Sequence, residues 1–138
     1  MAGDDAQRHG RTEDEWNRLT EEGLRFLEQR ARLGKVTSYT EMNTVLSRRT
    51  GFREFDFTQD GERHAMGQLL VRITEQERQR SGHMISSLVH YLDENDAGPG
   101  FYKFAQELGV LAPSAKADEK LVFWAAEVQA MFDYYRHG

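Results

Sequence analysis

The sequence predicts one mainly α-helical domain with a small β-sheet and about five helices. Three observations lead to this class. Apolar residues recur every three or four positions over several long segments, which is the spacing of amphipathic helices. Two short β-type runs, near residues 35–37 and 84–92, interrupt these segments. The chain has 138 residues, 38% of them hydrophobic, so it is long enough for one core and too short for two.

Composition excludes several classes of protein. The chain has no cysteine, which excludes disulfides, thiolate metal sites and a cysteine nucleophile. No apolar run approaches the roughly 18 residues that span a bilayer, and the acidic start of the chain is unlike a signal peptide. We therefore expect a cytoplasmic protein without a membrane partner. The net charge of -5 argues against a surface that is basic all over, yet residues 30–83 carry 10 basic and 7 acidic residues.

The N-terminal region predicts a tail followed by a helix. Residues 1–11 show no apolar periodicity and are predicted to be disordered, which leaves residues 12–138 as the domain. Thr12 and Glu15 have the spacing of a capping box, so a helix should begin there and end near Arg32. Its apolar face would consist of Trp16, Leu19, Gly23, Phe26 and Leu27.

The next segment, "GKVTSYTEMNTVL", joins a β-type run to a capped helix. Lys35 to Thr37 form a short extended stretch, and Ser38 lies three residues before Glu41, which is the spacing of a helix capping box. Gly51 has the position of a left-handed residue after the helix. The sequence therefore predicts a short strand, then a helix of about a dozen residues.

A phenylalanine-rich loop and a third helix follow. Residues 52–61 alternate Phe with charged residues and end in a turn, so the aromatic rings should cover the core. The next helix has one apolar face and one polar face that is basic at its start. The buried positions would be Met66, Leu69, Leu70 and Ile73, and the solvent-facing ones Arg63, His64, Gln68 and Arg72.

The last third of the chain predicts a strand, a turn and two helices. Residues 84–92 alternate faces in the manner of a strand, and a glycine-rich turn follows. A short helix should run from residue 101 to 108, and a major core helix from residue 117 to 136. The apolar positions of this last helix are Leu121, Trp124, Ala125, Val128, Met131, Phe132 and Tyr135. Because it and the first helix each carry an apolar stripe with a tryptophan, we expect the two to pack together.

This order of elements is that of a winged helix-turn-helix domain. The segment "GKVTSYTEM" resembles the motif that opens the helix-turn-helix of the alkylguanine-DNA alkyltransferases and their alkyltransferase-like relatives, and the similarity covers about residues 30–100. The resemblance implies that Thr37, Ser38 and Tyr39 contact DNA phosphates. It also implies that His64, which begins the stretch His-Ala-Met-Gly, replaces the arginine of the family's recognition helix, with Arg63 beside it.

The resemblance does not extend to the family's chemistry. The family transfers an alkyl group to the cysteine of a proline-cysteine-histidine-arginine motif, and residues 84–92 contain no cysteine. Alkyl transfer is thereby excluded, and no combination of acid, base and nucleophile can be assembled from the sequence. We therefore expect a protein that is not an enzyme and that needs no cofactor. His64, His83 and His90 lack the spacing of metal ligands, so we expect no metal site.

Two functions remain open. The first is a small, regulatory winged-helix protein that binds double-stranded DNA, plausibly as a homodimer because isolated modules bind weakly. Its candidate contacts are Lys35, Thr37, Ser38, Tyr39, Arg63, His64, Gln68 and Arg72. An alternative without DNA binding also explains these residues. Residues 37–39 would then begin an ordinary capped helix with Tyr39 in the core, and the residues from 63 to 72 would form a solvated helix face. The second function is a protein-interaction module that docks a partner through Phe52, Phe55, Phe57, Phe101 and Tyr102.

Overall fold

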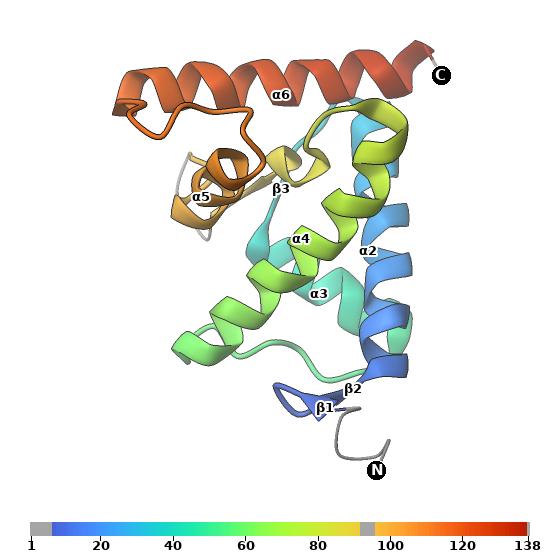
Figure 1. Cartoon of the computed structure of the whole chain (residues 1–138). Helices are drawn as coiled ribbons and strands as arrows, with labels where there is room; N and C mark the ends of the chain where they lie inside the picture. Colours follow the sequence, from blue (N-terminus) through green and yellow to red (C-terminus); the bar gives the residue numbers. More distant parts are fainter. Residues whose placement is uncertain (1–6, 92–95, 138) are drawn as a thin grey trace.

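The computed structural model describes residues 7–91 and 96–137 of the chain. This part contains five α-helices, one 3-10 helix and two sheets of two strands each. Helices α2 and α4 lie side by side, α6 crosses one end of the molecule, and the N-terminal hairpin lies at the opposite end (Figure 1). The predicted class, mainly helical with a small sheet and five helices, is confirmed.

Helix α2, Glu13–Leu33, is the predicted first helix. The side chain of Thr12 accepts a hydrogen bond from the N–H of Glu15 at 3.1 Å, and Glu15 accepts one from the N–H of Thr12 at 2.8 Å. The capping box therefore forms with both of its bonds. Gly34, with φ of 66°, ends the helix in the left-handed conformation that favours glycine.

An N-terminal hairpin precedes α2 where a disordered tail was predicted. Strand β1, Gln7–Arg8, pairs antiparallel with β2, Arg11–Thr12. The Arg11 guanidinium lies 4.2 Å from the ring of Phe55 and donates to the carbonyl of Arg53 at 2.9 Å. The prediction is therefore wrong for residues 7–11, because distant contacts order them; residues 1–6 lie outside the described residues.

Helix α3, Tyr39–Thr50, begins after β3, Thr37–Ser38. Ser38 accepts a hydrogen bond from the N–H of Glu41 at 3.0 Å, as predicted. The second bond of the predicted capping box is not among the hydrogen bonds of the described residues. The Glu41 carboxylate accepts instead from the Thr37 hydroxyl at 2.5 Å and from Arg30 at 3.0 Å. This carboxylate therefore ties the end of α2 to the start of α3.

The predicted strand at residues 84–92 is largely wrong. Ile85–Leu88 form the 3-10 helix η1, and only Val89–His90 form a strand, β4, which pairs parallel with β3; residue 92 lies outside the described residues. Every side chain from Ile85 to Val89 is buried. A short run that is buried on all sides has no diagnostic periodicity, so an alternating pattern does not separate a strand from a tight helical turn.

Helix α4, Asp60–Ser81, runs in the same direction as α2. Arg72 pairs with Glu13 in the first turn of α2 at 2.9 Å, and Arg80 pairs with Glu28 near the end of α2. The four residues of the predicted stripe are buried, as expected: Met66, Leu69, Leu70 and Ile73.

Helices α5, Pro99–Glu107, and α6, Ala117–His137, complete the fold. The described side chains of α6 include only two buried ones, Met131 and Tyr135, both in its second half. Leu121 is 44% exposed, so the prediction of a core helix is wrong for the first half. The second half does pack against α2, as predicted, because α6 crosses one end of the core and does not run along it.

Candidate functional site

A cavity of about 440 Å³ lies between the first half of α4, α5 and the strand β4. It combines apolar walls with polar groups at its mouth. The side chains that matter for its chemistry come from four separate segments: Tyr39, Arg63, His64, Gln68, Leu70, Val89, Tyr91, Phe101, Lys103 and Glu107.

Aromatic rings form one wall of the cavity. Tyr39 is buried and packs edge-on against Tyr91, with 5.4 Å between ring centroids, and at 5.9 Å from Phe57. Burial, together with the neighbouring Tyr91 phenol, raises the pKa of Tyr39 to about 12. The phenol therefore stays neutral at physiological pH, and this wall offers an uncharged aromatic surface.

Basic and amide groups of α4 lie at the mouth. Arg63 is half-buried, donates to the carbonyl of Phe57 at 2.5 Å and pairs with Asp60, so its guanidinium is held in place. His64 is exposed, and its ring lies edge-on to that of His9, with 5.8 Å between centroids. Gln68, one turn further along the helix, is exposed and has no fixed partner among the hydrogen bonds of the described residues.

Helix α5 forms the opposite wall. Its N-cap, Gly98, has φ of 87°, and a Cβ atom there would lie 2.7 Å from the Cβ of Tyr91. Glycine is therefore needed for both the backbone conformation and the close approach. Lys103 and Glu107 are exposed and lie one turn apart on this helix, facing the cavity.

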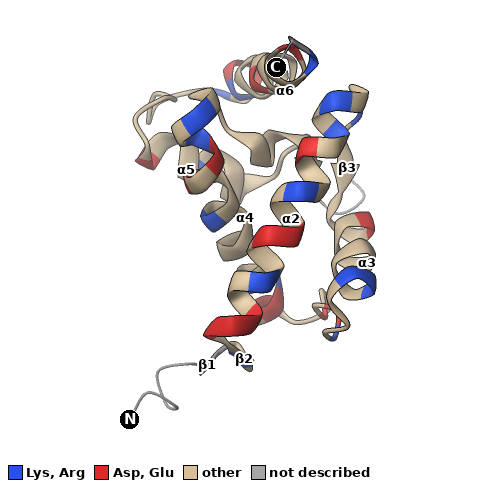
Figure 2. Cartoon of the chain, turned by 90° about the vertical axis from the view of Figure 1, so that its right-hand side faces the viewer, with Lys and Arg blue, Asp and Glu red and all other residues tan. Residues whose placement is uncertain are grey.

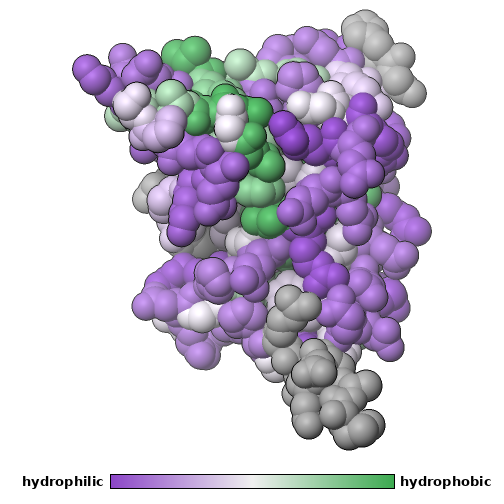
Figure 3. All heavy atoms as spheres, in the orientation of Figure 1, coloured by the Kyte–Doolittle hydropathy of each residue, from purple (hydrophilic) through white to green (hydrophobic). Residues whose placement is uncertain are grey.

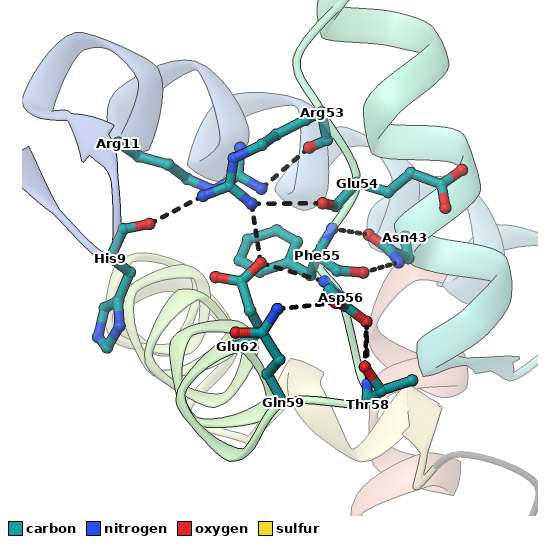
Figure 4. Close-up of polar contacts among 10 residues, drawn as sticks. All are labelled: His9, Arg11, Asn43, Arg53, Glu54, Phe55, Asp56, Thr58, Gln59 and Glu62. Atoms are coloured by element: carbon teal, nitrogen blue, oxygen red, sulfur yellow. Dashed lines mark hydrogen bonds and ion pairs between the residues drawn. The ribbon is translucent and has the colours of Figure 1, made fainter.

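A network of polar contacts fixes the connector that leads into α4 (Figure 4). The Asn43 amide exchanges two hydrogen bonds with the backbone of Phe55, each of 2.9 Å. The Glu62 carboxylate accepts from Arg53 at 2.8 Å and from the N–H of Asp56 at 3.1 Å. Burial opposes the charge of Glu62, but these donors outweigh it and lower its pKa. Helix α3 and the connector thus hold the start of α4 in a defined position.

Four of the eight predicted DNA contacts line the cavity, and the other four lie elsewhere. Tyr39 is buried in the core, as expected if α3 is an ordinary capped helix, and it also lines the cavity. The other three are the α4 residues Arg63, His64 and Gln68. Thr37 is buried and Ser38 is the helix cap, so neither side chain is presented. Lys35 is exposed but follows the end of α2, whereas Arg63 lies near the start of α4. Because α2 and α4 run in the same direction, these two cations lie toward opposite ends of the pair.

Arg72 was predicted to face solvent, and the structure contradicts this. Its guanidinium donates to Glu13 at 2.9 Å and to Asn17 at 3.1 Å, and it lies 5.7 Å from the ring centroid of Trp16. The side chain therefore joins α4 to α2. The helical period showed that Arg72 lies off the buried stripe, but it did not show that a second helix flanks this side of α4.

The aromatic docking surface of the protein-interaction hypothesis is also contradicted. Phe55, Phe101 and Tyr102 are buried, and Phe52 and Phe57 are half-buried against the main core. The phenylalanines that alternate with charged residues between positions 52 and 57 therefore cover the core. The exposed apolar side chains occur on other elements, among them Leu121 and Val122 of α6, which are 44% and 70% exposed.

Sequence reasoning missed the contribution of β4 and α5 to the site. Lys103, Glu107 and Tyr91 reach the cavity because α5 packs alongside α4, and no local pattern encodes this approach. Residues 7–91 and 96–137 hold no cluster of three histidine, aspartate or glutamate side chains that could ligate a metal. In the same part of the chain, no helix combines the length and the apolar character that a membrane crossing requires.

The cavity can bind a flat, uncharged ring against its aromatic wall and hold an adjoining anionic group at its mouth. Comparison with protein-family models, with curated proteins and with solved structures finds no match to this chain.

Proposed function

We propose that the protein is a non-enzymatic DNA-binding protein of winged-helix type that uses the first half of α4 and the cavity beside it. The observation that carries this proposal is the convergence of Tyr39, Arg63, His64 and Gln68 on one cavity. Three of these residues lie on the helix that would be the recognition helix, and the fourth begins the helix before it.

The chemistry of the cavity suits a nucleobase that has left the base stack. Aromatic side chains stack on the face of a base, and this contact favours every base by roughly 1–3 kcal/mol. The Gln68 amide offers both a donor and an acceptor to the edge of a base. Arg63 and Lys103 lie at the mouth, where the adjoining phosphates would be.

The order of elements supports a winged-helix arrangement. Helix α3 packs beneath the connector, α4 follows, and η1 and β4 return the chain to pair with β3 at the start of α3. The residues that follow β4, where a wing would lie, include 92–95, which are outside the described residues. The support for the proposal is therefore the order of the helices, in which α3 is followed by a connector and then by α4.

Fluorescence anisotropy with labelled DNA tests the proposal. One duplex should be fully paired and a second should carry a single unpaired base, because an unpaired base costs less to extrude. We expect tighter binding to the second duplex, and we expect Gln68→Ala to weaken it by about 1–3 kcal/mol. Arg72→Ala is the matched control on α4, because it removes a cation that contacts α2, and it should leave binding unchanged.

Two results would contradict the proposal. The first is no binding to either duplex at low salt. The second is equal binding by wild type, Gln68→Ala and Arg63→Ala, which would place any DNA contact away from the cavity. Thermal melts of each variant distinguish a lost contact from a lost fold.

A protein-binding role is the second candidate, and the exposed apolar surface of α6 favours it. Hydrophobic side chains gather over the first half of α6 and the connector before it (Figure 3). Leu121, Val122 and Val110 are each more than 40% exposed. Contiguous apolar surface of this kind is typical of contact with another protein.

A further inference from the structure

The exposed side of α6 carries a regular stripe of residues. Its positions alternate in steps of four and three, which is the 3.5-residue spacing of a coiled-coil seam. We name these residues the α6 stripe: Asp118, Val122, Ala125, Gln129, Phe132 and Arg136. All are exposed except Phe132, which is half-buried. The core side chains Met131 and Tyr135 lie on a different face of the helix.

The stripe is complementary to itself when it is reversed. It has an acidic residue at its N-terminal end and a basic residue at its C-terminal end, and between them lie Val122, Ala125, Phe132 and the uncharged Gln129. Placing Asp118 opposite Arg136 also places Val122 opposite Phe132, and Ala125 opposite Gln129. One antiparallel register therefore pairs opposite charges at both ends and uncharged residues inside them. The exposed part of Phe132 would contact Val122, while the rest of its ring packs against the main core.

We propose that α6 pairs antiparallel with α6 of a second copy of this chain, through the α6 stripe. A two-fold axis through the middle of the helix uses the same surface on both copies, which is the commonest symmetry of homodimers. Antiparallel helices also bring the N-terminal end of each dipole next to the C-terminal end of the other. Ala125 lets the two backbones approach closely, as small residues do in helix pairs.

The charges favour a second copy over other occupants. A nucleic acid would need one sign of charge along the surface, whereas the ends of the α6 stripe carry opposite signs. A membrane surface would favour a broad apolar face with basic residues beside it, whereas Asp118 and Asp133 lie on the exposed side of this helix. The proposal does not depend on DNA binding, because α6 is remote from the α4 residues that line the cavity.

Charge exchange between the ends of the stripe tests the pairing. Sedimentation equilibrium of the full chain should show a wild-type dimer that dissociates on dilution, as one helix pair is a small interface. Asp118→Arg places two arginines together at each end and should raise the dimer dissociation constant by about tenfold or more. Arg136→Asp should do the same. The double variant Asp118→Arg with Arg136→Asp restores opposite charges and should recover the dimer.

Glu21→Arg is the matched control, because Glu21 is exposed on α2 and the charge changes by the same amount. It should leave the dissociation constant unchanged, and thermal melts should show that every variant is folded. A wild type that stays monomeric at all concentrations would overturn the proposal. So would a double variant as weak as the two single variants, because that result is incompatible with the Asp118–Arg136 pairing.

Cysteine cross-linking tests the register independently, since the chain has no cysteine of its own. A mixture of Ala125→Cys and Gln129→Cys copies, each with a different tag, should oxidise mainly to the mixed disulfide. Preferential linkage of each variant to itself would contradict the antiparallel register.

Discussion

Glu77 is a buried carboxylic acid at the junction of three helices. Its two oxygens accept hydrogen bonds from Ser81 at 2.6 Å and from the Tyr135 hydroxyl at 2.7 Å. That hydroxyl also lies 3.2 Å from the Glu28 carboxylate, which pairs with Arg80. A phenol has one proton and cannot donate fully to two carboxylates. The two carboxylates therefore compete for one donor, and burial together with the nearby Glu28 charge disfavours the charged form of Glu77.

The raised pKa of Glu77 should appear in the pH dependence of the free energy of unfolding. Burial raises the pKa of Glu77 above its ordinary value of 4.5, more strongly than its hydrogen bonds lower it. The folded state therefore holds the proton more tightly than the unfolded state. The resulting stabilisation is fully present below the ordinary pKa and is lost as pH rises through the raised one. We expect Glu77→Gln to remove this loss, so the variant gains stability relative to wild type as pH increases.

Urea denaturation at a series of pH values measures the effect. Glu75→Gln, which changes an exposed residue of the same helix, is the control and should follow the wild-type curve. The same pH dependence for Glu77→Gln and wild type would mean that the pKa of Glu77 does not change on folding, which would contradict the prediction.

At the scale of single elements, α3 is packed and α4 is the helix beside the cavity. Tyr39, Met42 and Leu46 bury one side of α3, and Asn43 holds the connector through the backbone of Phe55. The helix that begins at the Ser38 cap thus positions the connector that leads into α4. Helix α3 contributes Tyr39 to the lining of the cavity, whereas α4 and α5 each contribute several residues.

The start of α5 should be sensitive to one glycine and tolerant at another. Gly98→Ala would force a side chain into a conformation with φ of 87° and against Tyr91. We expect a loss of stability of about 1–3 kcal/mol from the backbone conformation, and more if Tyr91 cannot move. Thermal or urea unfolding measures this loss.

Gly100→Ala is the comparison within the same helix. No atom lies within 4 Å of the position that its Cβ would occupy, so alanine should be neutral or should stabilise the helix by about 0.5–1 kcal/mol. Equal effects of the two substitutions would show that Gly98 is not constrained as the structure indicates.

At the scale of the whole molecule, the proposed DNA complex would make few phosphate contacts at the cavity. Basic and acidic side chains alternate along α2, and no face of one sign is visible in that view (Figure 2). At the mouth of the cavity, the arginine and lysine side chains are Arg63 and Lys103. Each phosphate contact contributes about -0.9 to the slope of log affinity against log salt concentration.

We therefore expect a slope of about -2 for DNA binding, and about -1 after Lys103→Ala. Anisotropy titrations at several salt concentrations measure both slopes. A steep slope that Lys103→Ala does not change would locate the phosphate contacts on another surface, such as the exposed arginines at the end of α3.

The sequence by itself determined where α2 and α3 begin and end. Thr12 with Glu15, Ser38, Gly34 and Gly51 are local signals, because a cap satisfies backbone groups within one turn of its own residue. The buried stripe of α4 was also readable, since helical period and apolar side chains together fix which face leaves water. These features need no knowledge of distant residues.

Only the tertiary structure decided what each surface contacts. Arg72 and Gln68 lie on the polar side of one helix, yet the first meets α2 and the second meets a cavity that α5 completes. The ordered Arg11, the 3-10 turn at Ile85–Leu88 and the exposed half of α6 depend likewise on segments far away in the sequence. The helical periodicity of the sequence predicts whether a side chain is buried. It does not predict which other segment the side chain contacts, and the candidate site is formed by contacts between distant segments.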